Sequence, residues 1–126
     1  MAVVAASFWS TIGILHYWSA PQDPNANLIH IVEATYGDNC QGFVTPARYP
    51  NTARPGNATA AVSAACDNTR ANCMFKIDVT QLGDPAVGCG KEFIARWRCG
   101  ASQQIHEVYF PAEANLRIAL IECQRW

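Results

Sequence analysis

Hydrophobic and polar residues alternate in several short stretches of the chain, a pattern typical of half-buried β-strands. In one stretch, Phe75, Ile77 and Val79 alternate with Lys76 and Asp78. Other stretches alternate in the same way or are rich in β-branched and aromatic residues. Together they predict strands over residues 28–34, 74–79, 91–99, 104–110 and 116–123.

A helix and a long loop are expected between the first two of these strands. Residues 57–66 are rich in alanine and predict one short helix, with Asn57 or Thr59 as its N-cap. Asn57 also begins an N-x-Thr glycosylation triplet, an alternative interpretation of the same residue. Residues 42–56 hold three prolines, which exclude a helix and predict a surface loop.

The first 22 residues carry no charged side chain. A signal peptide is disfavoured because no positive charge starts the segment, and polar residues interrupt the run that a membrane span requires. The β-branched and aromatic residues at 12–18 instead predict a sixth strand. Residues 1–28 are therefore expected to form an apolar arm and linker ahead of a domain at 29–126. Pairing of this arm with the sheet edge of a neighbouring subunit is the alternative.

Composition narrows the class of protein. The chain has 126 residues, of which 50% are hydrophobic and 15% charged, as expected for one globular domain. A net charge of −1 and the lack of a basic run argue against a nucleic-acid partner. Six cysteines without a CxxC pair indicate disulfides and an oxidising compartment. The predicted fold is therefore α+β, mainly β: a small disulfide-stapled antiparallel β-sandwich of five to six strands with one short helix.

The sequence gives no positive sign of catalysis, of a metal site or of a cofactor. The three histidines are far apart, and no known nucleophile, zinc or phosphate-loop motif is present. The glycine-rich stretch at 83–91, GDPAVGCGK, does not lead from a strand into a helix, so a dinucleotide site is not expected. Its Asp84 and Lys91 either form an ion pair on a turn or point together at a polar ligand.

Three ordered motifs resemble a known family. They are IVEATYGDNC at 31–40, AVSAACDNTRANCMFKI at 61–77 and LGDPAVGCGKEFIARWRC at 82–99. In this order they resemble the galactose- and rhamnose-binding lectins of the sea-urchin egg lectin type, over roughly residues 29–100. The resemblance implies a non-catalytic carbohydrate-binding domain, secreted or extracellular, in the periplasm or at a cell surface.

The family's sugar-binding motifs imply a site at Tyr36, Asp84 and Lys91, with Gly88 letting the backbone approach the ligand. A carboxylate accepts hydrogen bonds from neighbouring hydroxyls, an ammonium donates to them, and a tyrosine adds a ring face and one more hydrogen bond. The sequence departs from the family pattern at two places. The family usually has arginine at the position of Asp38, and it has cysteine at the position of Ala86, whereas this chain has its cysteine at Cys89. The family's ligand-binding glutamate on the first strand has no counterpart that can be placed.

The resemblance also implies how the cysteines pair. It joins Cys66 to Cys73 and suggests Cys40 with Cys89, which leaves Cys99 with Cys123. The expected partner is a glycan of the rhamnose or galactose type. The alternative function is that of a structural subunit in an extracellular assembly, a homo-oligomer built through the N-terminal arm.

Overall fold

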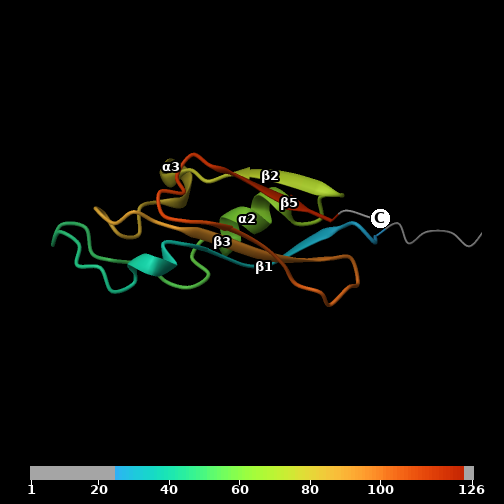
Figure 1. The fold of residues 1–126 in the computed structure, drawn as a ribbon, viewed down its shortest axis with the longest axis horizontal. Coiled ribbons are helices and arrows are strands. Elements are labelled where there is room, and N and C mark those ends of the chain that lie inside the picture. The colour runs from blue at the N-terminus through green and yellow to red at the C-terminus, as the bar shows by residue number, and fades with distance from the viewer. Residues whose placement is uncertain (1–24, 124–126) are drawn as a thin grey trace, which may run out of the picture.

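The computed structural model describes residues 25–123 and contains five strands in two antiparallel sheets (Figure 1). The larger sheet has the order β1 (Ile29–Tyr36), β3 (Phe93–Cys99) and β4 (His106–Phe110). The smaller sheet pairs β2 (Asn72–Lys76) with β5 (Ile118–Glu122). The predicted disulfide-stapled, mainly-β fold is thereby confirmed. The strand expected over residues 12–18 lies outside the described residues.

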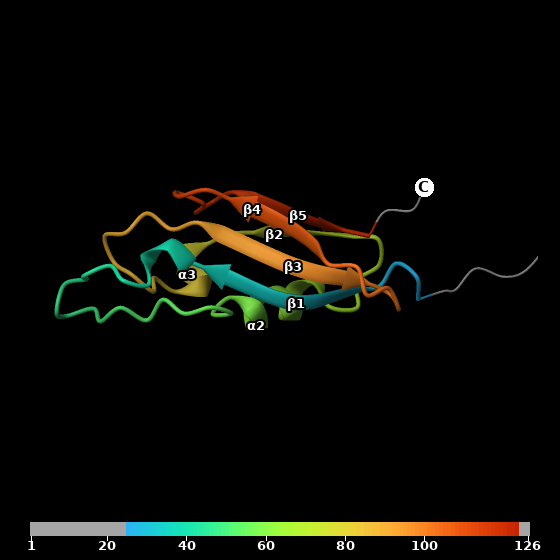
Figure 2. The same ribbon diagram turned by 60° about the horizontal axis from the view of Figure 1, so that its bottom comes forward.

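The core lies between the two sheets. From the larger sheet, Phe93, Ala95 and Trp97 face inward and are buried, as their alternation with Ile94, Arg96 and Arg98 predicts. The smaller sheet contributes Phe75, whose ring stacks on that of Phe93 with centroids 6.0 Å apart. Helix α2 (Thr59–Cys66) packs against β1 and β2, while β4 lies beside β5 on the other side (Figure 2). The apolar side chains are thus enclosed by two sheets and one helix.

The helix begins later than predicted, and Asn57 does not cap it. The N-cap of α2 is Ala58, which makes no side-chain cap hydrogen bond. Asn57 instead pairs with the free edge of β1: its Oδ1 accepts from the Tyr36 N–H at 2.7 Å, and its Nδ2 donates to the Tyr36 carbonyl at 2.8 Å. Thr59 Oγ1 accepts from the Ala34 N–H of the same edge. The side chains of Asn57 and Thr59, which were expected to cap the helix, therefore form hydrogen bonds with backbone groups of β1.

The chain after β2 also differs from the prediction, because the strand expected over residues 74–79 ends at Lys76. Asp78 accepts from the Thr80 N–H and starts a short helix, α3 (Val79–Leu82). A single turn of 3-10 helix, η1 (Asp38–Cys40), follows β1 and was not predicted. Residues 42–56 contain neither helix nor strand, as predicted.

The three disulfides join the same pairs that the resemblance implies. Cys66–Cys73 ties the end of α2 to β2, and Cys99–Cys123 ties β3 to the residue after β5. Cys40–Cys89 lies outside the main core, where Cys40 is buried with Ala53 and Ala86 in a small cluster and the partly buried Cys89 packs against it. Within residues 25–123, no helix is both long and apolar enough to cross a membrane.

Candidate functional site

Two loops meet at the end of the sandwich where β1 ends, opposite the end at which the described chain begins and finishes (Figure 1). The Cys40–Cys89 disulfide joins them covalently. The Asn39 side chain adds two hydrogen bonds, donating to the Gly90 carbonyl at 2.8 Å and accepting from the Glu92 N–H at 3.1 Å. These links hold the loop after Tyr36 and the loop before β3 in a fixed relation.

Lys91 is the centre of this region. Its side chain is only 8% exposed, and its Nζ lies 2.8 Å from Asp84 Oδ1 and 2.7 Å from the Cys89 carbonyl. An ammonium has three N–H donors, so one donor of Lys91 has no partner among the described residues. Asp84 and Lys91 therefore form an ion pair, which is one of the two alternatives that the sequence left open. One N–H donor of Lys91 remains for a ligand.

Asp84 is the more accessible partner, with 37% of its side chain exposed. Its Oδ1 accepts from Lys91 and, at 3.2 Å, from the Ala86 N–H, which fixes the turn. Its Oδ2 has no partner among the described residues. A carboxylate offers about four acceptor positions, so Asp84 keeps acceptor capacity on the side that faces solvent.

Tyr36 lies beside Lys91, whose Nζ is 5.9 Å from the centre of the phenol ring. The residue is only 3% exposed, so its ring belongs to the core, and the expectation that it offers a ring face to a sugar is wrong. Its hydroxyl has no hydrogen-bond partner among the described residues. Every fully buried side-chain oxygen in this part of the chain does have a partner, so the Tyr36 hydroxyl oxygen is not fully buried. The hydroxyl oxygen therefore touches solvent.

Burial and the surrounding negative charge both favour the neutral form of the Tyr36 phenol. Burial raises the pKa of Tyr36 above its ordinary value, and the carboxylates of Asp84, Glu113 and Asp78 raise this pKa further because they oppose a phenolate. At physiological pH the hydroxyl is consequently both a hydrogen-bond donor and an acceptor.

Gly88 has a different role from that of the three polar residues. Its φ of +91° is in the left-handed region, which favours glycine, and a Cβ at this position would lie 3.6 Å from the ring of Phe43. Gly88 thus lets the loop turn before the Cys40–Cys89 disulfide, while a Cβ here would make only an ordinary van der Waals contact with Phe43. The structure brings together Tyr36, Asp84 and Lys91, while it sets Gly88 against Phe43.

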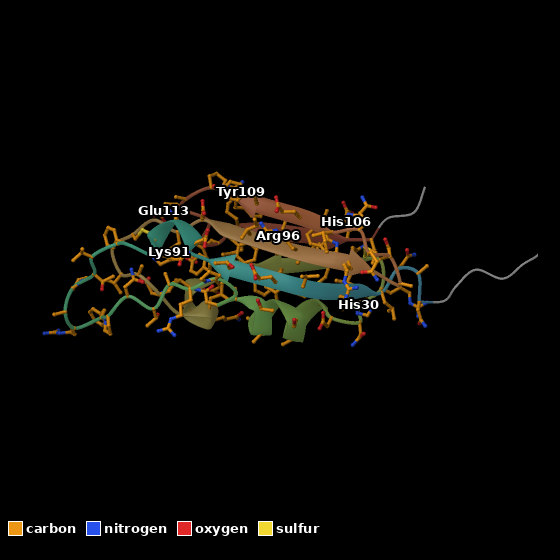
Figure 3. The ribbon with its side chains drawn as sticks, turned by 90° about the horizontal axis from the view of Figure 1, so that it is seen from below. His30, Lys91, Arg96, His106, Tyr109 and Glu113 are labelled. Carbon is orange, nitrogen blue, oxygen red and sulfur yellow. A yellow bond between two sulfur atoms is a disulfide. The ribbon has the colours of Figure 1, made fainter. Side chains whose placement is uncertain are left out.

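Glu113 is a further residue of this site that was not predicted. The Ala114 N–H donates to the Lys91 carbonyl at 3.0 Å and brings this segment against the loop. The Glu113 carboxylate lies directly over Gly90, where a Cβ would collide with it. Lys91 and Glu113 lie toward the same end of the sandwich, whereas His30 and His106 lie toward the other (Figure 3). No local pattern marks Glu113, since its position depends on a backbone contact between distant segments.

These groups are suited to binding a polyhydroxylated ligand. Two carboxylates accept hydrogen bonds, while the third Lys91 donor and the Tyr36 hydroxyl can donate them. In the part of the chain that is described, no group of three histidine, cysteine or acidic residues is placed to hold a metal ion. Comparison with known proteins found no matching family model, no similar curated protein and no similar solved structure.

Proposed function

We propose that this chain is a non-catalytic carbohydrate-binding domain of the galactose- and rhamnose-binding lectin type. One observation carries the proposal: Tyr36, Asp84 and Lys91, which the lectin motifs select from distant parts of the sequence, lie together at one end of the sandwich. In this proposal the sugar's adjacent hydroxyls bind to the third Lys91 donor, to Asp84 Oδ2 and to the Tyr36 hydroxyl.

The hydrogen bonds within the site support a ligand with adjacent hydroxyls. Each hydroxyl donates one hydrogen bond and accepts others, so a pair of neighbouring hydroxyls can contact the carboxylate of Asp84 and the ammonium of Lys91 at once. The ion pair at 2.8 Å sets these two groups at the spacing of one such pair. Because the Cys40–Cys89 disulfide and Asn39 hold the loops, little side-chain order has to be gained on binding.

The proposed location is outside the cell or in the periplasm. Three disulfides in a chain of this size are typical of proteins that fold in an oxidising compartment. A glycan-binding domain would meet its ligand there, at a cell surface or in secreted form.

A glycan array probed with the purified protein tests this function. We expect binding to rhamnose- or galactose-terminated glycans, and a loss of roughly tenfold or more in Asp84→Asn, which removes the charge from the acceptor. The matched control is Asp67→Asn. Asp67 lies away from the site, and its Oδ1 accepts a hydrogen bond from the Ile31 N–H that the amide oxygen of asparagine can also accept. Equal glycan binding by Asp84→Asn and the wild type would contradict the proposal.

A second candidate function, that of a subunit in an extracellular assembly, is favoured by a surface patch. On the outer face of the smaller sheet, Met74 is 73% exposed, Ile118 55% and Leu120 45%. Met74 lies directly opposite Leu120 in the register, so these side chains share one face. Exposed apolar side chains grouped in this way often mark a contact with another protein.

Size-exclusion chromatography distinguishes this second candidate. If the patch joins subunits, the full chain elutes as an oligomer and Leu120→Lys yields monomers. If the N-terminal arm joins them, removal of residues 1–20 yields monomers instead. Val44→Lys serves as control, because Val44 is 89% exposed in the loop before α2 and lies outside the patch. A wild-type chain that elutes as a monomer at all concentrations would exclude the assembly.

A further inference from the structure

Glu113 is held at the sugar-binding end by its backbone. Its φ of +42° is in the left-handed region, a conformation that a side-chain-bearing residue adopts only where the surrounding contacts impose it. The imposing contacts are those of the next residue: the Ala114 N–H donates to the Lys91 carbonyl, and Ala114 itself is fully buried. These contacts fix the backbone of Glu113, and its exposed carboxylate lies over Gly90, the residue before Lys91, with no hydrogen-bond partner among the described residues.

The unpartnered hydroxyl of Tyr36 is the second observation. A residue that is only 3% exposed normally satisfies its polar atom within the protein, yet this hydroxyl is left for solvent or a ligand. Among the groups close enough to act on Tyr36 electrostatically, Asp84 and Glu113 lead, with Asp78 after them. A ligand hydroxyl that reaches the Tyr36 hydroxyl would therefore lie in the field of these carboxylates.

The charges of the site are unequal. Asp84 and Glu113 contribute two negative charges, and Lys91 supplies the positive charge. The ion pair with Asp84 already offsets Lys91, so the excess charge that an incoming ligand meets is that of Glu113. At separations of a few ångströms and near a surface, an uncompensated charge of this kind changes an anion's affinity by about tenfold.

We infer that Glu113 is a specificity-determining residue of this site, whose carboxylate accepts a hydrogen bond from a sugar hydroxyl beside Tyr36 and repels carboxylated sugars. The site therefore selects neutral sugars over uronic acids. This inference rests on the proposed function, because it assigns the ligand class of the same site.

Galactose and galacturonic acid are the matched probes, because they share their ring hydroxyls and differ in the carboxylate at C6. In competition titrations we expect the wild type to prefer galactose by about tenfold at low salt, and less as ionic strength rises. Glu113→Gln, which keeps the shape of the side chain, weakens galactose binding and removes most of the preference. The control is Glu107→Gln, which removes a carboxylate charge from the ion pair of Glu107 with Arg96. It should change neither the galactose affinity nor the preference for galactose.

A second variant moves the carboxylate without removing it. Gly90→Ala places a Cβ against the end of the Glu113 side chain, which is flexible enough to move aside. We expect Gly90→Ala to lower galactose affinity while it keeps part of the discrimination against galacturonic acid. Thermal unfolding of both variants checks that the fold is retained.

The outcomes separate the two proposals. If the wild type binds galactose, but accepts galacturonic acid equally well, or if Glu113→Gln changes neither affinity, the role of Glu113 is overturned and the sugar site stands. If the wild type binds neither probe, the proposed function fails for this sugar, and the inference fails with it.

Discussion

Lys91→Met will reduce sugar affinity by about 10- to 150-fold, the loss expected when a hydrogen bond from a charged donor worth about 1.5–3 kcal/mol is removed. Methionine keeps an unbranched apolar stem of similar length, so the packing of Lys91 next to Gly37 is preserved. The ammonium is lost, and with it both the donor for the ligand and the partner of Asp84. Isothermal titration with the sugar identified on the array measures the loss.

The chain provides its own control for this change. Lys76, the other lysine, is exposed on β2 and belongs to the opposite sheet, so Lys76→Met removes the same charge without touching the site. Sugar affinity in Lys76→Met should equal that of the wild type. A Lys91→Met protein that folds normally and binds sugar as tightly as the wild type would refute the role given to the ammonium.

Removal of the Cys40–Cys89 disulfide is expected to have the largest effect on stability. These cysteines are 49 residues apart, and closing a loop of that length lowers the entropy of the unfolded chain enough to stabilise the fold by about 4 kcal/mol. In the double variant Cys40→Ala and Cys89→Ala, the free energy of unfolding in urea should fall by about this amount. Sugar binding should fall too, because Asp84 and Lys91 are held against Tyr36 partly through this link.

The Cys66–Cys73 disulfide is the comparison. It closes a loop of only 7 residues, for which the same reasoning gives about 2 kcal/mol. The matched variant Cys66→Ala and Cys73→Ala should therefore be less destabilised, and its sugar affinity should be retained because α2 lies away from the site. A smaller loss of stability in the Cys40 and Cys89 variant than in this one would contradict the expectation.

The strands could be predicted from the sequence because each has one face in the core. Alternation predicts residues 91–99 as a strand, and β3 occupies Phe93–Cys99 with the expected residues buried. Prediction failed where a side chain serves a distant partner. Asn57 has the chemistry of a helix cap but hydrogen-bonds to β1, and only the tertiary structure brings that edge close.

The end of β2 could have been inferred from the sequence. Asp78 and Val79 continue the apparent alternation, but aspartate is also a favoured N-cap residue at the start of a helix. The hydrogen bond from the Thr80 N–H to Asp78 decides in favour of the helix. Periodicity alone does not distinguish the two.

The site was partly predictable. The motifs select Tyr36, Asp84 and Lys91 from the amino-acid sequence alone, and the ion pair between Asp84 and Lys91 brings two of them into contact. The burial of the Tyr36 ring could not be predicted, since it depends on the packing of the core. Glu113 was missed because a backbone hydrogen bond between Ala114 and Lys91, which leaves no trace in the local sequence, carries it to the site.

An NMR titration of the isotope-labelled full chain with rhamnose and with galactose tests the central claim most directly. The proposal predicts saturable shifts of backbone amides for at least one sugar at millimolar or lower concentration, confined to residues 36–40, 83–92 and 112–114. The absence of saturable shifts with either sugar, or shifts centred on the smaller sheet, would contradict a sugar site at Tyr36, Asp84 and Lys91.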